Sequence, residues 1–193
     1  MKNLDITCNI SGDTLTIKGK GIISDYSLCG NTEQKEYCTD LIKRKGITSV
    51  IIEDILSIGD KAFYDCDTLE SVTISESVKS IGYGAFWGCI GLKSIIIPNS
   101  VTSIGNSAFS GCYGLKSIII GDSVKSIADN AFYDCRFLGE ITNYSITPQI
   151  INSNVFTIED KVTCILQVPA EAINDYYKAA VWKDFKDNIF EIY

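Results

Sequence analysis

The stretch "SIGYGAFWGCIGLKSIIIPNSVT" (Ser80–Thr102) decides the fold, because the next 23 residues, Ser103–Lys125, repeat it at 16 of 23 positions. Units of the same length also begin at Ser57 and Ser126. A unit this short cannot bury its own apolar face, so successive copies must stack on one another and share one core. The sequence therefore predicts a right-handed α/β repeat solenoid of four to five rungs.

Each repeat contains a strand-like half and a turn-like half. The segment "LKSIIIP" alternates as a short β-strand does, with Leu92, Ile95 and Ile97 pointing into the core, and stacked copies predict one parallel β-sheet. The segment "GAFWGC" suits a turn of α- or 3₁₀-helix on the convex side. A glycine follows the inward isoleucine, where we expect a positive φ. The predicted strands are Ser49–Ile52, Ser71–Ile74, Ser94–Ile97, Ser117–Ile120 and Glu140–Asn143, and the glycines are Gly59, Gly82 and Gly105.

Both ends of a solenoid expose apolar surface and unpaired strand edges, so we expect a cap at each end. At the N-terminus, alternating segments around Ser11-Gly12-Asp13 predict a β-hairpin. Residues 32–46 predict a helix that is N-capped by Thr32, has basic residues in its last turn and stops at Gly46.

At the C-terminus the repeat decays after Asn143. Residues 162–169 predict a strand, residues 170–182 a helix, and residues 188–193 a last strand. Trp182 and Phe185 are expected to pack in this cap. The expected division is an N-terminal cap over 1–46, repeats of 23 residues over 47–143 and a C-terminal cap over 144–193.

Composition narrows the possible functions. The chain has 193 residues, a formal charge of −7 and no histidine. An acidic chain lacks the clustered Lys and Arg that neutralise nucleic-acid phosphates, and no apolar run reaches the roughly 18 residues of a membrane span. The missing histidine removes His-activated nucleophiles and His metal ligands. We therefore expect a non-enzymatic protein with no metal, no cofactor, no nucleic-acid partner and no membrane span.

Four of the eight cysteines recur every 23 residues, in phase with the apolar positions. Zinc sites need closely spaced cysteine pairs, which this sequence lacks. A disulfide between neighbouring rungs is conceivable, but equivalent inward positions favour free thiols that pack in the core. Those four are Cys66, Cys89, Cys112 and Cys135. Among Cys8, Cys29, Cys38 and Cys164 a bridge is the less favoured interpretation, and their redox state stays open.

The repeat pattern I-G-x-x-A-F-x-x-C-x-x-L-x-x-I-x-I-P-x-x-V resembles the BspA-type leucine-rich repeat. Residues 12–27 resemble the N-terminal cap of that family, and residues 164–192 resemble its C-terminal module. Ser75 and Gly121 depart from the pattern, because each stands where the family has proline. The family is common in surface proteins of anaerobic mucosal bacteria and some protozoan parasites. The resemblance implies a leucine-rich-repeat solenoid in a cell-surface or secreted protein that mediates protein or host-surface contacts.

The first residues lack the apolar core of a signal peptide, so either a leader has been removed or the protein stays inside the cell. The alternative function is accordingly a cytoplasmic interaction scaffold. In either case, the residue between the two inward positions of each strand must face outward. We expect a protein or glycan partner, or a second copy of the chain, to bind this exposed face. The candidate residues are Ile51, Thr73, Ile96, Ile119 and Thr142, with Lys93 and Lys116 at the margin.

Overall fold

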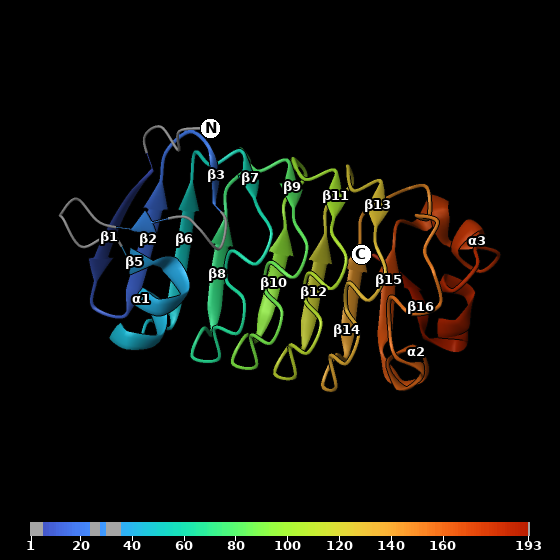
Figure 1. Cartoon of the computed structure of the whole chain (residues 1–193). Helices are drawn as coiled ribbons and strands as arrows, with labels where there is room; N and C mark the ends of the chain where they lie inside the picture. The colour runs from blue at the N-terminus through green and yellow to red at the C-terminus, as the bar shows by residue number, and fades with distance from the viewer. Residues whose placement is uncertain (1–5, 24–27, 30–35, 193) are drawn as a thin grey trace.

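The computed structural model describes residues 6–23, 28–29 and 36–192. The longer strands lie side by side and form one face of an elongated solenoid (Figure 1). The N-terminal hairpin occupies one end of the solenoid, and the helical segments α2 and α3 occupy the other (Figure 1). The α/β repeat solenoid predicted from the sequence is therefore confirmed.

Strand β1 pairs antiparallel with β2, and every later pairing along this face is parallel. The pairing is interrupted between β8 and β10, so the strands of this face form two sheets where the sequence predicted one. Equivalent residues of successive repeats are paired directly, as Ser94 is with Ser117 and Ser117 with Glu140. All five strands predicted from the repeat are present. The strands of this face are β1 (Thr7–Ser11), β2 (Thr14–Lys18), β6 (Ser49–Glu53), β8 (Ser71–Ile74), β10 (Ser94–Ile97), β12 (Ser117–Ile120), β14 (Glu140–Asn143), β15 (Ile165–Val168) and β16 (Ile189–Glu191).

A separate parallel sheet, which the sequence pattern did not reveal, runs along the top of the solenoid in Figure 1. Its strands are the Ser-Ile dipeptides that open each repeat, preceded by Ile22–Ile23. Two residues are too few to show the alternation by which a strand is recognised in a sequence. These strands are β3 (Ile22–Ile23), β7 (Ser57–Ile58), β9 (Ser80–Ile81), β11 (Ser103–Ile104) and β13 (Ser126–Ile127).

A column of stacked phenylalanines forms the centre of the core. Phe63, Phe86, Phe109 and Phe132 stack with ring centroids 5.1–5.4 Å apart. The stack continues to Phe156 at 5.6 Å, and Phe185 packs edge-on against that ring. All of these rings are fully buried. One continuous core therefore extends beyond Asn143, where the sequence repeat fades.

The convex segments form consecutive turns, and the glycine prediction was wrong. Gly59, Gly82 and Gly105 do not have positive φ. A Cβ on Gly105 would lie 2.6 Å from the carbonyl carbon of Gly82, so glycine is needed there because neighbouring rungs approach closely. The left-handed residues occupy two other columns, one on each side of the Ala-Phe pair. They are Lys61, Gly84, Ser107 and Asn130, and then Asp65, Gly88, Gly111 and Asp134.

The N-terminal hairpin is confirmed, but the helix is shorter than predicted. Helix α1 spans Cys38–Lys45, and the preceding Glu36–Tyr37 is strand β5, which pairs antiparallel with β4 (Leu28–Cys29). The predicted N-cap, Thr32, lies outside the described residues. Gly46 has a φ of 63° and ends the helix as expected. The buried face of α1, with Leu41 and Ile42, covers the apolar end of the core.

At the C-terminus the two predicted strands are present as β15 and β16, but the single predicted helix is not. It is broken into η1 (Ala170–Ala172), α3 (Ile173–Tyr176) and η2 (Trp182–Asn188). The chain turns at Val181, which has a φ of 68°. This turn directs the Trp182 indole into the core, where its N–H donates to the carbonyl of Gln149 at 2.8 Å. Helix α2 (Ile158–Thr163) was not predicted.

The repeated cysteines form no disulfide and are fully buried, as predicted. Each thiol except the first also donates to the phenylalanine carbonyl of the preceding rung. The Sγ–O distances are 3.1 Å from Cys89 to Phe63 and from Cys112 to Phe86, and 3.3 Å from Cys135 to Phe109. Burial raises the pKa of Cys89 to about 12, so this thiol stays protonated at neutral pH.

Outside the repeat, Cys38 and Cys164 form no disulfide, whereas Cys8 is disulfide-bonded. The preference for no bridge among these cysteines was therefore wrong at Cys8. A single bridge outside the repeat has no periodicity, so the spacing of the cysteines gave no signal for it.

Candidate interaction surface

The outward-facing column of the long strands is exposed where the sequence analysis placed it. Ile96 of β10 is 59% exposed, whereas its neighbours Ile95 and Ile97 are each 1% exposed. Ile96 pairs with Ile119, and the same row continues through Thr142 and Gln167 to Phe190. We call this row, from Ile96 to Phe190, the outer row. Ile119 is half-buried, and Phe190 is exposed.

The remaining candidates are distributed unevenly. Ile51 of β6 pairs with Thr73 of β8. Ile51 is half-buried, and Thr73 is exposed. Lys93 and Lys116 are exposed and immediately precede β10 and β12. Thr142 is a correction, because only 8% of it is exposed. Its hydroxyl donates to the side-chain carbonyl of Gln167 at 3.1 Å, which holds the two side chains against each other.

Charge differs between the two ends of these strands. Lys93 and Lys116 precede the strands, whereas Glu76 and Asp122 occupy equivalent positions after β8 and β12. The isoleucines of the outer row lie between the two groups. Along β10 and β12 the order across the face is lysine, isoleucine and then Asn99 or Asp122, whereas Glu70 and Glu140 place exposed carboxylates beside the two lysines.

A hollow of about 290 Å³ lies beside Ile96 and Ile119 at the acidic edge, and we call it the acidic hollow. One Glu76 oxygen accepts from the Ser100 backbone N–H at 3.2 Å, and one Asp122 oxygen accepts from the Ser123 hydroxyl at 3.0 Å. Each carboxylate keeps a second oxygen with no partner among the described residues. The lining residues are Glu76, Ile96, Ile97, Pro98, Asn99, Ile119, Gly121, Asp122 and Tyr144.

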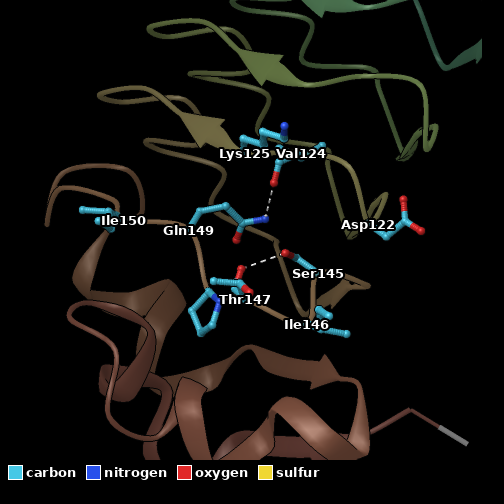
Figure 2. A pocket seen from close by; sticks show the side chains of 9 residues that line it. Asp122, Val124, Lys125, Ser145, Ile146, Thr147, Gln149 and Ile150 are labelled. Carbon is cyan, nitrogen blue, oxygen red and sulfur yellow. Dashed lines mark hydrogen bonds between the residues drawn. The ribbon is translucent and has the colours of Figure 1, made fainter.

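A second hollow, of about 440 Å³, adjoins the first and shares Asp122 with it; we call it the loop hollow (Figure 2). The chain from Ser145 to Ile150 forms one wall, and Val124 and Lys125 contribute to the other. In Figure 2 the Gln149 side chain crosses between them, donating to the Val124 carbonyl at 2.9 Å. Ile146 and Ile150 are 61% and 97% exposed.

The loop that carries these isoleucines is fixed by buried hydrogen bonds. The Tyr176 hydroxyl donates to the Ser145 carbonyl at 2.9 Å, and the Trp182 indole donates to the Gln149 carbonyl. The Asn143 amide donates to the Gln149 side-chain carbonyl at 2.9 Å. The two exposed isoleucines are therefore presented by a loop whose backbone is anchored to the C-terminal segment.

The convex side carries an exposed aromatic pair. The rings of Tyr64 and Trp87 stack with centroids 4.6 Å apart, and both residues are 37% exposed. The ammonium of Lys61 lies 5.5 Å from the centre of the Tyr64 ring. Ser110 occupies the equivalent position in the next repeat and Tyr133 the one after it, so this column is interrupted.

The acidic hollow was missed at the sequence level, although a signal for it was present. Glu76, Asn99 and Asp122 occupy the same position in three successive repeats, 23 residues apart. A polar column predicts exposed positions, but by itself it does not show that neighbouring rungs leave a hollow between them. Tyr144, which completes the hollow, lies where the repeat fades and carries no periodic signal.

The described residues contain neither a cluster of metal ligands nor a membrane-spanning helix. No group of three or more cysteine, aspartate or glutamate side chains there lies close enough together to hold a metal ion. Within the same residues, no helix has both the length and the apolar character needed to cross a membrane.

Comparisons with solved structures found similar bacterial proteins. The pneumococcal vaccine antigen PcpA superposes with a TM-score of 0.60 at 25% identity, over 76% of this chain and 36% of that one. A leucine-rich repeat protein from Bacteroides ovatus gives 0.54 at 24% identity, over 90% and 56%. A leucine rich cell surface protein from Faecalibacterium prausnitzii is 38% identical over 50% of this chain and 26% of that one, with a TM-score of 0.49. The chain spans only part of the length of each.

None of the curated proteins compared with the chain matches it. A family model described as a BspA type leucine rich repeat region matches residues 41–167 in six copies. Six copies exceed the four to five rungs predicted, in keeping with a phenylalanine stack that continues to Phe156. The matched residues make up most of the chain, and the chain belongs to the BspA-type leucine-rich repeat family.

Proposed function

We propose that this chain is a non-enzymatic protein-binding module of a cell-surface or secreted protein, and that its partner binds the outer row. The observation that carries the proposal is the exposure of Ile96 between two fully buried neighbours. Strand geometry forces the middle residue outward but does not require it to be apolar, and Thr73 serves at the equivalent position of β8. Exposed apolar residues that adjoin one another mark contact surfaces.

The size of the face favours an elongated partner segment over a second copy of the chain. The five strands of the outer row have three or four residues each. At a spacing of about 4.8 Å they present at most about 24 Å by 13 Å, or roughly 300 Å². Standard interfaces bury about 800 Å² on each partner. A partner would therefore extend past the strand ends onto the acidic hollow, which adjoins the outer row at Ile96 and Ile119, and from there onto the loop hollow, which shares Asp122 with it.

Two observations support a location outside the cell. The chain is similar to PcpA, which is a pneumococcal vaccine antigen. Cys8 is disulfide-bonded, and disulfides persist in oxidising compartments rather than in the cytosol. The cytoplasmic scaffold is the weaker alternative. Limited proteolysis of intact cells tests the location, because a surface protein is cleaved under conditions that leave cytosolic markers intact.

The binding test compares two faces of the same molecule. Ile96→Asp combined with Ile119→Thr places a charge and a small polar residue on the outer row. Trp87→Ser alters the convex face and copies the residue that Ser110 already provides one repeat later. Biolayer interferometry against purified extracellular-matrix proteins and mucin glycans would identify a ligand for the unmodified chain.

We expect the outer-row variant to lose at least tenfold in affinity and the Trp87→Ser variant to change less than twofold. Thermal unfolding of both variants should stay close to that of the unmodified chain, because the altered side chains face outward. The reverse pattern would move the site to the convex aromatic pair, where stacking on a sugar ring would favour a glycan. If the unmodified chain self-associates in sedimentation experiments at rising concentration and the outer-row variant does not, the partner is a second copy of the chain.

A further inference from the structure

The acidic hollow combines three features that suit one kind of ligand group. Ile96 and Ile119 supply apolar surface, the exposed ring of Tyr144 supplies an aromatic group, and Glu76 and Asp122 supply negative charge. Glu76 and Asp122 are two repeats apart in one column, so their backbones are separated by about 10 Å at the usual strand spacing. The Asn99 side chain lies in the same column between them, and its carbonyl accepts from the Asp122 backbone N–H at 3.1 Å.

We propose that the acidic hollow binds an arginine side chain of the partner protein. An arginine has an aliphatic stem that packs on apolar surface, and its planar guanidinium stacks on aromatic rings and donates to carboxylates. The stem lies along Ile96 and Ile119, and the guanidinium lies beside Tyr144 between the two carboxylates. This inference rests on the proposed function, since it names the group that the outer row's partner presents.

Charge complementarity selects this occupant. Glu76 and Asp122 form no ion pair with any described residue, and each keeps a carboxylate oxygen without a partner. Lys125 lines the adjoining loop hollow with Asp122 but makes no ion pair with it. Lys93 and Lys116 lie at the opposite ends of the strands. The negative charge of the hollow is therefore available to a cation from outside.

Lysine fits the same hollow less well. Its ammonium is a compact, strongly hydrated charge that loses more hydration on binding, and it cannot engage two separated carboxylates in one plane. Arginine also stacks on tyrosine more favourably than lysine does. The order of affinity is therefore arginine, then lysine, then an uncharged isostere.

The test uses short peptides, because the partner is unidentified. Acetylated and amidated Leu-Arg-Leu is titrated into the full chain, with Leu-Lys-Leu and Leu-citrulline-Leu as comparisons, and isoleucine methyl signals are followed by NMR. We expect saturable shifts of the Ile96 and Ile119 methyl groups with the arginine peptide. Citrulline keeps the shape of arginine without its charge, and its peptide should bind at least fivefold more weakly.

Two double variants, each of which removes two negative charges, distinguish specific binding in the acidic hollow from general electrostatic attraction to an acidic protein. Glu76→Gln with Asp122→Asn should weaken the arginine peptide at least fivefold, while each amide keeps an oxygen that can accept the existing hydrogen bond. Glu70→Gln with Glu140→Gln removes two exposed carboxylates elsewhere on the same face and should change affinity less than twofold. Equal weakening by both pairs, or a lysine or citrulline peptide that binds as well as arginine, overturns the proposal.

Failure of this inference is distinguishable from failure of the proposed function. If the outer-row variant abolishes partner binding while the arginine peptide never shifts the two methyl groups, the binding face stands and the arginine assignment falls. If the arginine peptide binds as expected while the outer-row variant keeps full affinity for its partner, the hollow stands and the proposed function falls.

Discussion

The central repeats and the C-terminal segment solve the same packing problem in different ways. Between Ser80 and Lys125, the strands of one repeat pair in register with the equivalent strands of the next. The phenylalanine rings of the two repeats also stack on each other. Beyond Asn143, single side chains take over: Tyr176 and Trp182 donate buried hydrogen bonds to the Ser145 and Gln149 carbonyls, and these bonds have no counterpart among the described residues of the repeats. Periodic stacking distributes stability over many similar contacts, whereas the end of the solenoid depends on a few individual ones.

The largest loss of stability is expected for Trp182→Ala. The substitution removes a fully buried indole and leaves the Gln149 carbonyl without its donor, so we expect the free energy of unfolding to fall by about 4–5 kcal/mol. Urea unfolding monitored by circular dichroism measures the loss. A fall of less than 1 kcal/mol would show that the C-terminal segment is not what closes the core.

The matched change in the repeats is Phe109→Ala. Its ring stacks on Phe86 and Phe132, at centroid distances of 5.2 Å and 5.4 Å, and neither neighbour loses a hydrogen-bond partner. In the same urea measurement we expect the free energy of unfolding to fall by about 3–4 kcal/mol. This is less than for Trp182→Ala, because no polar group loses its hydrogen-bond partner. A cost above that of Trp182→Ala would reverse the comparison.

A smaller effect with a distinctive pH dependence is expected for Cys89→Ala. At pH 7 the lost packing and thiol hydrogen bond should cost about 1–2 kcal/mol. Burial raises the pKa of Cys89 from an ordinary 9.0 to about 12, so above pH 9 the thiol ionises only in the unfolded chain, and the unmodified protein loses stability as pH rises towards 12.

The alanine variant has no such loss, because it has no thiol to ionise. From pH 8 to pH 10 the thiol's contribution falls by roughly 1 kcal/mol, so the gap between the two proteins should become markedly smaller. Urea unfolding at the two pH values provides the check. A gap that stays constant would mean that the Cys89 thiol ionises equally in both states, as an exposed thiol does.

The smallest effect is expected at the junction between the two regions. Thr142→Val keeps the shape of the side chain and removes the hydroxyl that donates to Gln167, which should cost about 0.5–1 kcal/mol. The Gln167 side chain is only half-buried and can turn to water. Differential scanning calorimetry would detect the shift, and a cost above 2 kcal/mol would place Thr142 in the group of indispensable single contacts.

The same contrast explains which parts of the molecule the sequence could predict. The five strands of the repeat and the inward positions of Ile95 and Ile97 were predictable, because the same signal recurs every 23 residues. The break at Val181 was not, since it depends on Trp182 reaching Gln149, 33 residues earlier in the chain. A helical pattern in one short segment contains no information about such a distant partner.

The candidate surface was predictable only in part. Strand alternation placed Ile96 and Ile119 on the outer face, but it could not show that Thr142 is covered through its bond to Gln167. The acidic hollow needed the alignment of Glu76 with Asp122 and also the position of Tyr144, which lies outside the regular repeat. Local periodicity thus fixes which way a side chain points, while hollows arise from residues that different rungs bring together.

The near identity of Ser80–Thr102 and Ser103–Lys125 has a consequence for how such a protein can change over evolutionary time. Because each of these units contacts only its neighbours, an in-frame duplication of one unit would insert a rung without creating a new kind of contact. The outer row would lengthen by about 4.8 Å, and both end structures would stay as they are. The length of the binding face can therefore change with the number of repeats, while the side chains that line each hollow stay the same.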